Sequence, residues 1–213
     1  MLASVNIMST EISKKKKYEL RARADSQRQT RDRIARAAAD LHEENGVART
    51  TVVEIARRAG VSRLTVYNHF PDLESLLPAC AAHYISVHPS PDFAEAIAAE
   101  APGERVVAVL TQLYAWYRET EPLFGKLFSD RFSVPELDAF MTNGVDRMQE
   151  HVTSILSTAA GQVAGESAEH QRALARVAAE FWTWRRLGRE GLADQDAARL
   201  MADVVLGGVR AGG

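Results

Sequence analysis

The stretch TVVEIARRAGVSRLTVYNHF, which runs from Thr51 to Phe70, sets the fold of the N-terminal part of this 213-residue chain. Its first four residues, T-V-V-E, form a capping box that predicts a helix start at Thr51. Gly60 ends that helix, and Ser62 is the type of residue that caps the next one. Two helices joined by a tight turn that contains glycine form a helix-turn-helix, whose second helix can enter the major groove of DNA.

The second of these helices has two chemically different faces. Val66 and Phe70 lie on the inward face together with Val61, which predicts a compact core shared with the preceding helix. The outward face and its flank carry a second group of side chains: Arg63, Leu64, Thr65, Tyr67, Asn68 and His69. Such a surface can meet both the base edges and the phosphates of DNA. A packed helical hairpin that merely exposes its tyrosine and histidine is the alternative interpretation.

The chemistry of the bases and phosphates predicts a contact for each outward side chain. Arg63 can pair bidentately with guanine, and Asn68 can pair with adenine. The side chains expected to face bases are Arg63, Leu64, Thr65 and Asn68, and those expected to meet phosphates are Thr51, Tyr67 and His69. Ser62 completes the predicted surface at the helix N-terminus, where the partial positive charge of the helix favours anions.

One predicted helix flanks the helix-turn-helix on each side. An apolar series at helical spacing begins after residue 30: Ile34, Ala38 and Leu41. Gly46 stops this helix after Asn45. On the other side, Asp72 is expected to cap a fourth helix that contains Leu76 and Leu77.

Residues 1–29 are polar, and they include the basic run Lys14, Lys15, Lys16 and Lys17. They have no sustained apolar stripe, so we expect a mostly disordered arm with a helical extension late in the segment. Residues 1–77 carry 14 Lys or Arg against 10 Asp or Glu, whereas residues 78–213 carry 12 against 18. This asymmetry suggests an anionic partner for the first part only. The arm could follow the DNA backbone or enter the minor groove, and an inert, solvated tail is equally compatible with it.

The segment TTVVEIARRAGVSRLTVYNHFPDLESLL, residues 50–77, resembles the DNA-binding domain of the TetR-type transcriptional regulators, and the resemblance extends back to Thr30. It implies a homodimer that represses at a palindromic operator and is released when a small molecule binds the C-terminal domain. It also implies the division of base and phosphate contacts given above. One residue departs from the family pattern, since Leu73 stands where the family usually has lysine, and this loses a phosphate contact.

The composition of the chain is that of an ordinary globular protein, with 46% hydrophobic and 25% charged residues. The lone cysteine, Cys80, excludes an intrachain disulfide framework and fits a reducing cytoplasm. The chain has no apolar run of the roughly 20 residues that a membrane span needs, and no signal-peptide core. We therefore expect a soluble cytoplasmic protein with no membrane partner.

Beyond the helix-turn-helix, the chain shows further helical patterns at about 92–100, 103–119, 122–130, 134–160, 167–188 and 194–210. No segment alternates apolar and polar residues for long enough to predict a strand. The expected fold class is therefore all-α, with three parts. Residues 1–29 form the arm, residues 30–77 the three-helix DNA-binding domain, and residues 78–213 a larger helical domain for ligand binding and dimerisation.

The larger domain holds most of the aromatic residues, which usually form core but also line ligand pockets. The residues predicted to line a pocket are Trp116, Tyr117, Phe124, Phe128, Phe140, Met141, Met148 and Trp182, with His151 as a polar anchor. The expected ligand is a largely hydrophobic small molecule with little or no charge. No cofactor is expected.

Two apolar stripes near the C-terminus are predicted to pair across a two-fold axis in a four-helix interface. Their residues are Leu174, Val177, Ala178, Phe181, Ala197, Leu200, Met201, Val204 and Val205. The alternative is that both stripes only close the core of the monomer.

An enzyme is the first rival class of function. The six histidines form no HExxH or similar metal-binding spacing, the single cysteine lies in no nucleophile motif, and the chain has no glycine-rich phosphate loop. A catalytic role and a metal site are therefore not expected. The second rival is a helical small-molecule-binding or protein-interaction module with weak or vestigial DNA binding, to which Leu73 gives some support.

Overall fold

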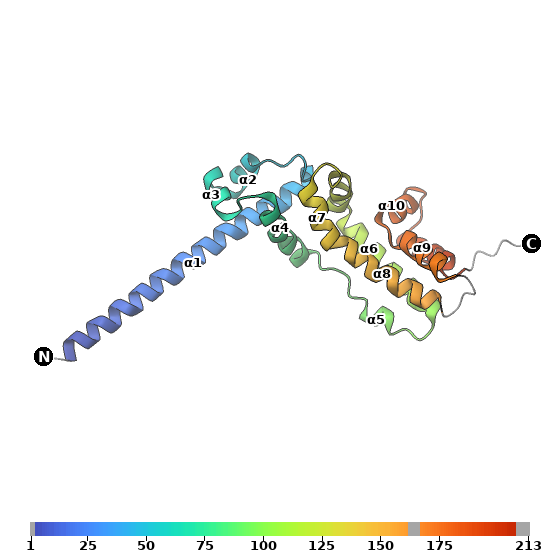
Figure 1. Cartoon of the computed structure of the whole chain (residues 1–213), viewed down its shortest axis with the longest axis horizontal. Helices are drawn as coiled ribbons and strands as arrows, with labels where there is room; N and C mark the ends of the chain where they lie inside the picture. Colours follow the sequence, from blue (N-terminus) through green and yellow to red (C-terminus); the bar gives the residue numbers. More distant parts are fainter. Residues whose placement is uncertain (1–2, 162–166, 208–213) are drawn as a thin grey trace, which may run out of the picture.

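The computed structural model of the chain describes residues 3–161 and 167–207, with side chains from Tyr18 onward. All regular secondary structure in these two ranges is helical, which confirms the all-α fold class. Figure 1 shows a long N-terminal helix that extends away from a body made of the other helices. None of the helices in this described part combines the length and apolar character that crossing a bilayer requires.

The first four helices are α1 (Ala3–Asn45), α2 (Val52–Ala59), α3 (Arg63–His69) and α4 (Leu73–Val87). The start and end of α2 and the starts of α3 and α4 lie where capping chemistry predicts them. The Thr51 hydroxyl accepts a hydrogen bond from the Glu54 amide at 3.3 Å, and the Glu54 carboxylate accepts one from the Thr51 amide at 2.9 Å. Gly60 has a φ of 66°, in the left-handed region that glycine adopts at low cost. The side chains of Ser62 and Asp72 accept hydrogen bonds from the amides three residues on and so start α3 and α4.

Helix α1 differs from the expected N-terminal arm, because it already begins at Ala3 instead of near residue 30. The segment from Ala3 to Asn45 contains neither proline nor glycine, so no residue in it stops helix propagation. Residues 18–29 are exposed, and this part of α1 projects beyond the body of the molecule (Figure 1). Among the described side chains of α1, the buried ones lie from Ile34 onward, in the C-terminal part of the helix.

The remaining helices are α5 (Ala94–Ile97), α6 (Pro102–Asp130), α7 (Pro135–Asn143), α8 (Val145–Ala160), α9 (Ala168–Ala179), α10 (Phe181–Arg189) and α11 (Asp194–Val205). Helix α6 passes through Pro122 without a break, although the sequence predicted two helices there. It packs against α1, α8 and α11, and this packing outweighs the one hydrogen bond that proline removes. The helix predicted over 134–160 is divided at Gly144.

The helix predicted over 167–188 is divided at Glu180, which has extended backbone with a ψ of 136°. The break leaves carbonyl groups at the end of α9 that need donors. The buried hydroxyls of Tyr114 and Tyr117 supply them, donating to the carbonyls of Ala178 at 2.7 Å and Ala179 at 2.8 Å. These two tyrosines of α6 therefore fix the path of the chain between α9 and α10.

The buried apolar residues form two clusters. The N-terminal cluster consists of Ile34, Ala35, Ala37, Ala38, Ala39, Leu41, Ile55, Ala56, Ala59, Val66, Phe70, Leu76 and Cys80. The C-terminal cluster is larger and draws mainly on α6, α8, α9 and α11. Helix α4 belongs to both, because Leu76 and Cys80 pack in the first cluster while Leu77 and Tyr84 pack in the second. A shift of α4 therefore disturbs both cores.

Candidate nucleic-acid interface and ligand cavity

Helix α3 exposes the face that the sequence predicts to read DNA. Leu64 is 69% exposed and Tyr67 is 51% exposed, whereas Val66 is 1% exposed. Arg63 and Asn68 are also exposed, and Thr65 and His69 lie half-buried at the flank. The inward positions of Val66 and Phe70 in the N-terminal cluster fix which way the outward residues point.

Arg31 on α1 holds the C-terminal end of α3, a role that sequence reasoning missed. Its guanidinium donates to the carbonyl of His69 at 2.7 Å and lies 4.0 Å from the centre of the Phe70 ring. Arginine near the end of a helix satisfies a free carbonyl and interacts favourably with the helix dipole. The only signal in the sequence is one more arginine in an arginine-rich helix, so the pairing depends on the fold.

Two residues at the edge of this surface, Thr51 and Leu73, already have contacts within the chain. The Thr51 hydroxyl already donates to the Glu54 carboxylate at 2.7 Å, so a phosphate contact from this proton requires an exchange of partners. Leu73 packs, half-buried, against the C-terminal cluster, which gives a structural role to the residue that departs from the family pattern. The side chains of the Lys14–Lys17 run lie outside the described part of the structure.

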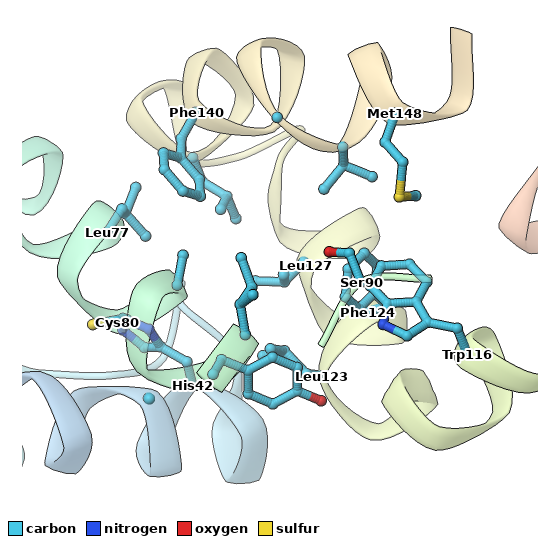
Figure 2. A pocket seen from close by; sticks show the side chains of 17 residues that line it. His42, Leu77, Cys80, Ser90, Trp116, Leu123, Phe124, Leu127, Phe140 and Met148 are labelled. Atoms are coloured by element: carbon cyan, nitrogen blue, oxygen red, sulfur yellow. The ribbon is translucent and has the colours of Figure 1, made fainter. Parts of the chain in front are cut away.

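A cavity of about 270 Å³ lies where the two clusters meet. It is lined by Ala39, His42, Leu77, Cys80, Ala81, Tyr84, Ile85, Ser90, Trp116, Leu123, Phe124, Leu127, Leu137, Phe140, Gly144, Val145 and Met148. Figure 2 shows His42 and Cys80 on one side and the ring of Trp116 on the other. Helices α1 and α4 therefore face α6, α7 and α8 across this space.

The cavity contains four of the predicted pocket residues, namely Trp116, Phe124, Phe140 and Met148. The other five, Tyr117, Phe128, Met141, His151 and Trp182, do not line it. Tyr117 and Phe128 face α10 instead, with ring centres 5.4 Å and 5.2 Å from that of Phe181. Met141 is buried in the C-terminal cluster, and His151 and Trp182 are exposed.

Sequence reasoning missed the contribution of α1 and α4 to the cavity. His42, on α1, is 4% exposed, and burial lowers its pKa to about 4 against a smaller opposing effect of the Asp130 carboxylate. Its imidazole is therefore neutral near pH 7. Burial also raises the pKa of the Cys80 thiol to about 12. The imidazole of His42 and the thiol of Cys80 are therefore both neutral near pH 7.

One carboxylate at the end of α6 contacts the turn that precedes the helix-turn-helix. Asp130 accepts a hydrogen bond from the amide of Ala48 at 3.1 Å, in the turn between α1 and α2. Gly46 in the same turn has a φ of 86°, and a Cβ added there would collide with the Asp130 carboxylate. The same helix carries Trp116, Leu123 and other lining residues, so α6 connects the cavity to the turn that precedes the helix-turn-helix.

The predicted dimer residues divide into two groups. Ala178, Phe181, Ala197, Met201 and Val205 are buried within the single chain. Val177 and Leu200 are 47% and 41% exposed, and Leu174 and Val204 are half-buried. Helices α9 and α11 pack against each other, so an apolar outer surface remains after the core of the monomer is closed.

Within residues 18–161 and 167–207, no group of three or more His, Cys, Asp or Glu side chains is placed to hold a metal ion.

The N-terminal part of the chain is similar to known regulators in sequence. Residues 34–80 match the family described as bacterial regulatory proteins, tetR family. An uncharacterized HTH-type transcriptional regulator of Mycobacterium tuberculosis is 49% identical over 57 residues, which is 27% of this chain and 30% of that relative. The sequence match to this relative thus spans less than a third of the relative's length.

Most of the fold is similar to solved structures. A Clostridium perfringens protein assigned as a fatty acid metabolism regulator matches with a TM-score of 0.61 at 16% identity, over 84% of this chain and 100% of that one. A TetR-like transcriptional regulator from Rhodococcus sp. RHA1 matches with a TM-score of 0.58 at 17% identity, over 86% of this chain and 97% of that one. At such identities the likeness shows the fold alone. The Mycobacterium tuberculosis relative and the Rhodococcus protein are both described as transcriptional regulators.

Proposed function

We propose that the chain is a ligand-responsive transcriptional repressor of the TetR type, because its residues 34–80 match the family of bacterial regulatory proteins, tetR family. It binds a palindromic operator as a homodimer and leaves it when a small, largely hydrophobic effector binds. The observation that carries the proposal is the exposed polar face of α3, held in place by a fully capped helix-turn-helix and by Arg31. We expect the protein in the cytoplasm, because its proposed partner is double-stranded DNA.

The reading face uses two kinds of contact. Arg63 and Asn68 carry the donors that pair with guanine and adenine, while Leu64 and Thr65 offer apolar contact to thymine methyl groups. The Tyr67 hydroxyl and His69 meet phosphates at the edge of the groove and set the orientation of α3. The Lys14–Lys17 run adds phosphate contacts that carry no sequence information.

A homodimer supplies the two reading heads that a palindrome needs. The outer surface of α9 and α11 is the proposed interface, with Leu174, Val177, Leu200 and Val204 as its apolar residues. An isologous two-fold contact would bury this surface twice and so hold the two copies of α3 at a fixed spacing.

The position of the cavity supports coupling between effector and DNA. A molecule in it contacts His42 on α1, Cys80 and Tyr84 on α4, and Trp116 on α6 at the same time. Helix α4 also packs in the N-terminal cluster, so its displacement moves the helix-turn-helix. The effector releases DNA only if it prefers the arrangement of the two reading heads that fits the operator badly.

Selection of a random double-stranded DNA pool on the purified protein tests the proposal. We expect one palindromic sequence to be enriched, and we expect Tyr67→Ala to abolish the enrichment. Phe132→Ala is the matched control, because Phe132 is an exposed aromatic residue that lies outside α3. A protein that enriches no sequence, and whose weak binding vanishes with modest added salt, is instead a helical small-molecule-binding or protein-interaction module.

A further inference from the structure

Two polar groups in the lining of the cavity have no hydrogen-bond partner. Among the described residues, the buried side-chain atoms without a partner are the Tyr84 hydroxyl, the Trp116 Nε1 and the Gln112 Oε1. Tyr84 and Trp116 are 9% and 8% exposed, and both line the cavity. Buried polar groups in folded proteins are almost always paired, so two exceptions in one cavity point to a ligand.

The other buried phenols of the same core show what is unusual here. Tyr114 and Tyr117 each donate to a backbone carbonyl, and Tyr117 also accepts from the Gln149 amide at 3.1 Å. The C-terminal cluster therefore satisfies its structural tyrosines completely. Tyr84 and Trp116 instead border the open volume, and Figure 2 shows the nitrogen-bearing edge of the Trp116 indole turned toward it.

The direction of hydrogen bonding determines part of the ligand's chemistry. An indole N–H can only donate, so the ligand must present an acceptor to Trp116. The Tyr84 hydroxyl can donate or accept. Burial, with smaller effects of the Glu43 and Glu119 carboxylates, raises the pKa of this phenol, so it keeps its proton at neutral pH.

The charge of the lining disfavours an ionic ligand. No Asp, Glu, Lys or Arg is among the lining residues, and the His42 imidazole and the Cys80 thiol are neutral at pH 7. A buried ion without a counter-charge is strongly disfavoured. The aromatic rings of Trp116, Phe124 and Phe140 could attract a cation, so this alternative needs a direct test.

The volume of the cavity limits the size of the ligand. A 150 Å³ cavity takes up benzene, so a cavity of about 270 Å³ corresponds by proportion to about eleven non-hydrogen atoms.

We propose that the cavity binds a neutral, largely apolar molecule of about this size, whose hydrogen-bond acceptor is held by the Trp116 indole N–H and whose polar end lies within reach of the Tyr84 hydroxyl. The inference that this molecule binds in the cavity depends on the structure alone, whereas its role as the effector rests on the proposed function.

Calorimetry on the 213-residue chain with a matched pair of probes tests the inference. Butyrophenone is a neutral ketone of this size, and 2-phenyl-1-pentene replaces its carbonyl oxygen by a methylene group. We expect Trp116→Phe to lower the ketone-to-alkene affinity ratio about tenfold, because the ring remains but the donor is lost. Trp182→Phe is the control, since Trp182 lies outside the cavity, and should change the ratio less than about twofold.

Further probes and a second readout cover the other outcomes. 4-Phenylbutyrate and benzyltrimethylammonium should bind at least about tenfold more weakly than the ketone, and tighter binding of either ion overturns the inference. An unchanged affinity ratio in Trp116→Phe, or no binding of the neutral probes, also overturns it, the latter because water alone then satisfies both groups. If Trp116→Phe fails to fold, the indole N–H resonance of Trp116 in the unmodified protein must shift with the ketone and not with the alkene.

The two proposals fail separately. A selected palindrome without preference for the ketone refutes only the ligand chemistry. A preference for the ketone in a protein that selects no DNA sequence refutes only the regulator.

Discussion

The N-terminal and C-terminal clusters are both built from helices, but they use their polar groups and their space differently. In the N-terminal cluster, alanine-rich packing closes the core, and Thr51, Ser62 and Asp72 cap their helices. The C-terminal cluster leaves about 270 Å³ open and two polar groups unpaired at the boundary with the first. Reading DNA needs a rigid face, whereas responding to a ligand needs room next to that face.

The connection between the two clusters gives the largest expected effect on stability. Gly46→Ala should lower the free energy of unfolding by about 3 kcal/mol, because the left-handed backbone costs about 1–2 kcal/mol and the Asp130 contact to the turn is lost as well. Gly60→Ala is the matched control, since Gly60 also has a positive φ but a Cβ there meets no atom within 4 Å. It should cost about 1–2 kcal/mol by urea denaturation. Equal costs at the two positions would contradict a tight contact at Asp130.

The buried imidazole of His42, in the wall of the cavity, should make the free energy of unfolding depend on pH in the acid range. Its pKa is lowered to about 4, so between pH 6.5 and pH 4 a proton binds the unfolded chain but not the folded one. This should lower the free energy of unfolding by about 3 kcal/mol as the pH falls through that range, with no contribution above pH 6.5.

Urea denaturation of the wild type and His42→Leu at pH 7.5 and pH 4.5 measures this contribution. The variant should lose about 2–3 kcal/mol less than the wild type between the two pH values. His151→Leu is the control for removing an imidazole from an exposed site. If His42→Leu is as acid-sensitive as the wild type, the imidazole is not buried in its neutral form.

Because the two regions differ in packing, an alanine-to-leucine substitution should cost stability in the N-terminal cluster but little at the cavity. Ala38 is fully buried in the N-terminal cluster, so Ala38→Leu should cost about 2 kcal/mol by overpacking. Ala81 on α4 lines the cavity, so Ala81→Leu has space to fill and should change stability by no more than about 0.5 kcal/mol. Thermal unfolding of the two variants compares them directly. A similar loss at both positions would mean that the cavity is not available space.

The smallest expected effect concerns the support of α3. Arg31→Ala removes the contact to the His69 carbonyl and to the Phe70 ring, and should lower stability by about 1 kcal/mol. Arg36→Ala, at an exposed position of the same helix, is the control for loss of charge. Hydrogen exchange should show faster opening of the α3 amides in Arg31→Ala only. Equal exchange in the two variants would remove Arg31 from the support of α3.

The sequence predicted the N-terminal cluster well because its signals are local. A capping box, a left-handed glycine and an N-cap serine act within three or four residues, so the ends of α2 and α3 follow from the chain alone.

The lining of the cavity could not be predicted from the sequence alone, because it is assembled from α1, α4, α6, α7 and α8. Trp116 and Tyr117 are neighbours in sequence, yet one faces the cavity and the other faces α10. Helix α6 is buried around most of its circumference, so its apolar periodicity cannot distinguish these two sides. The extension of α1 was missed for a different reason, since a polar composition indicates exposure but does not prevent a helix.

Fluorescence anisotropy of a selected palindromic duplex, titrated with the wild type, Arg63→Ala and Tyr67→Ala, tests most directly whether α3 reads DNA. We expect two chains per duplex, and a loss of affinity of about tenfold or more in each variant with unchanged helical circular dichroism. Arg63→Ala should also reduce the preference for the selected sequence over its scrambled version, whereas Tyr67→Ala should weaken binding to both. Variants that bind both duplexes as tightly as the wild type would show that α3 is not the reading helix.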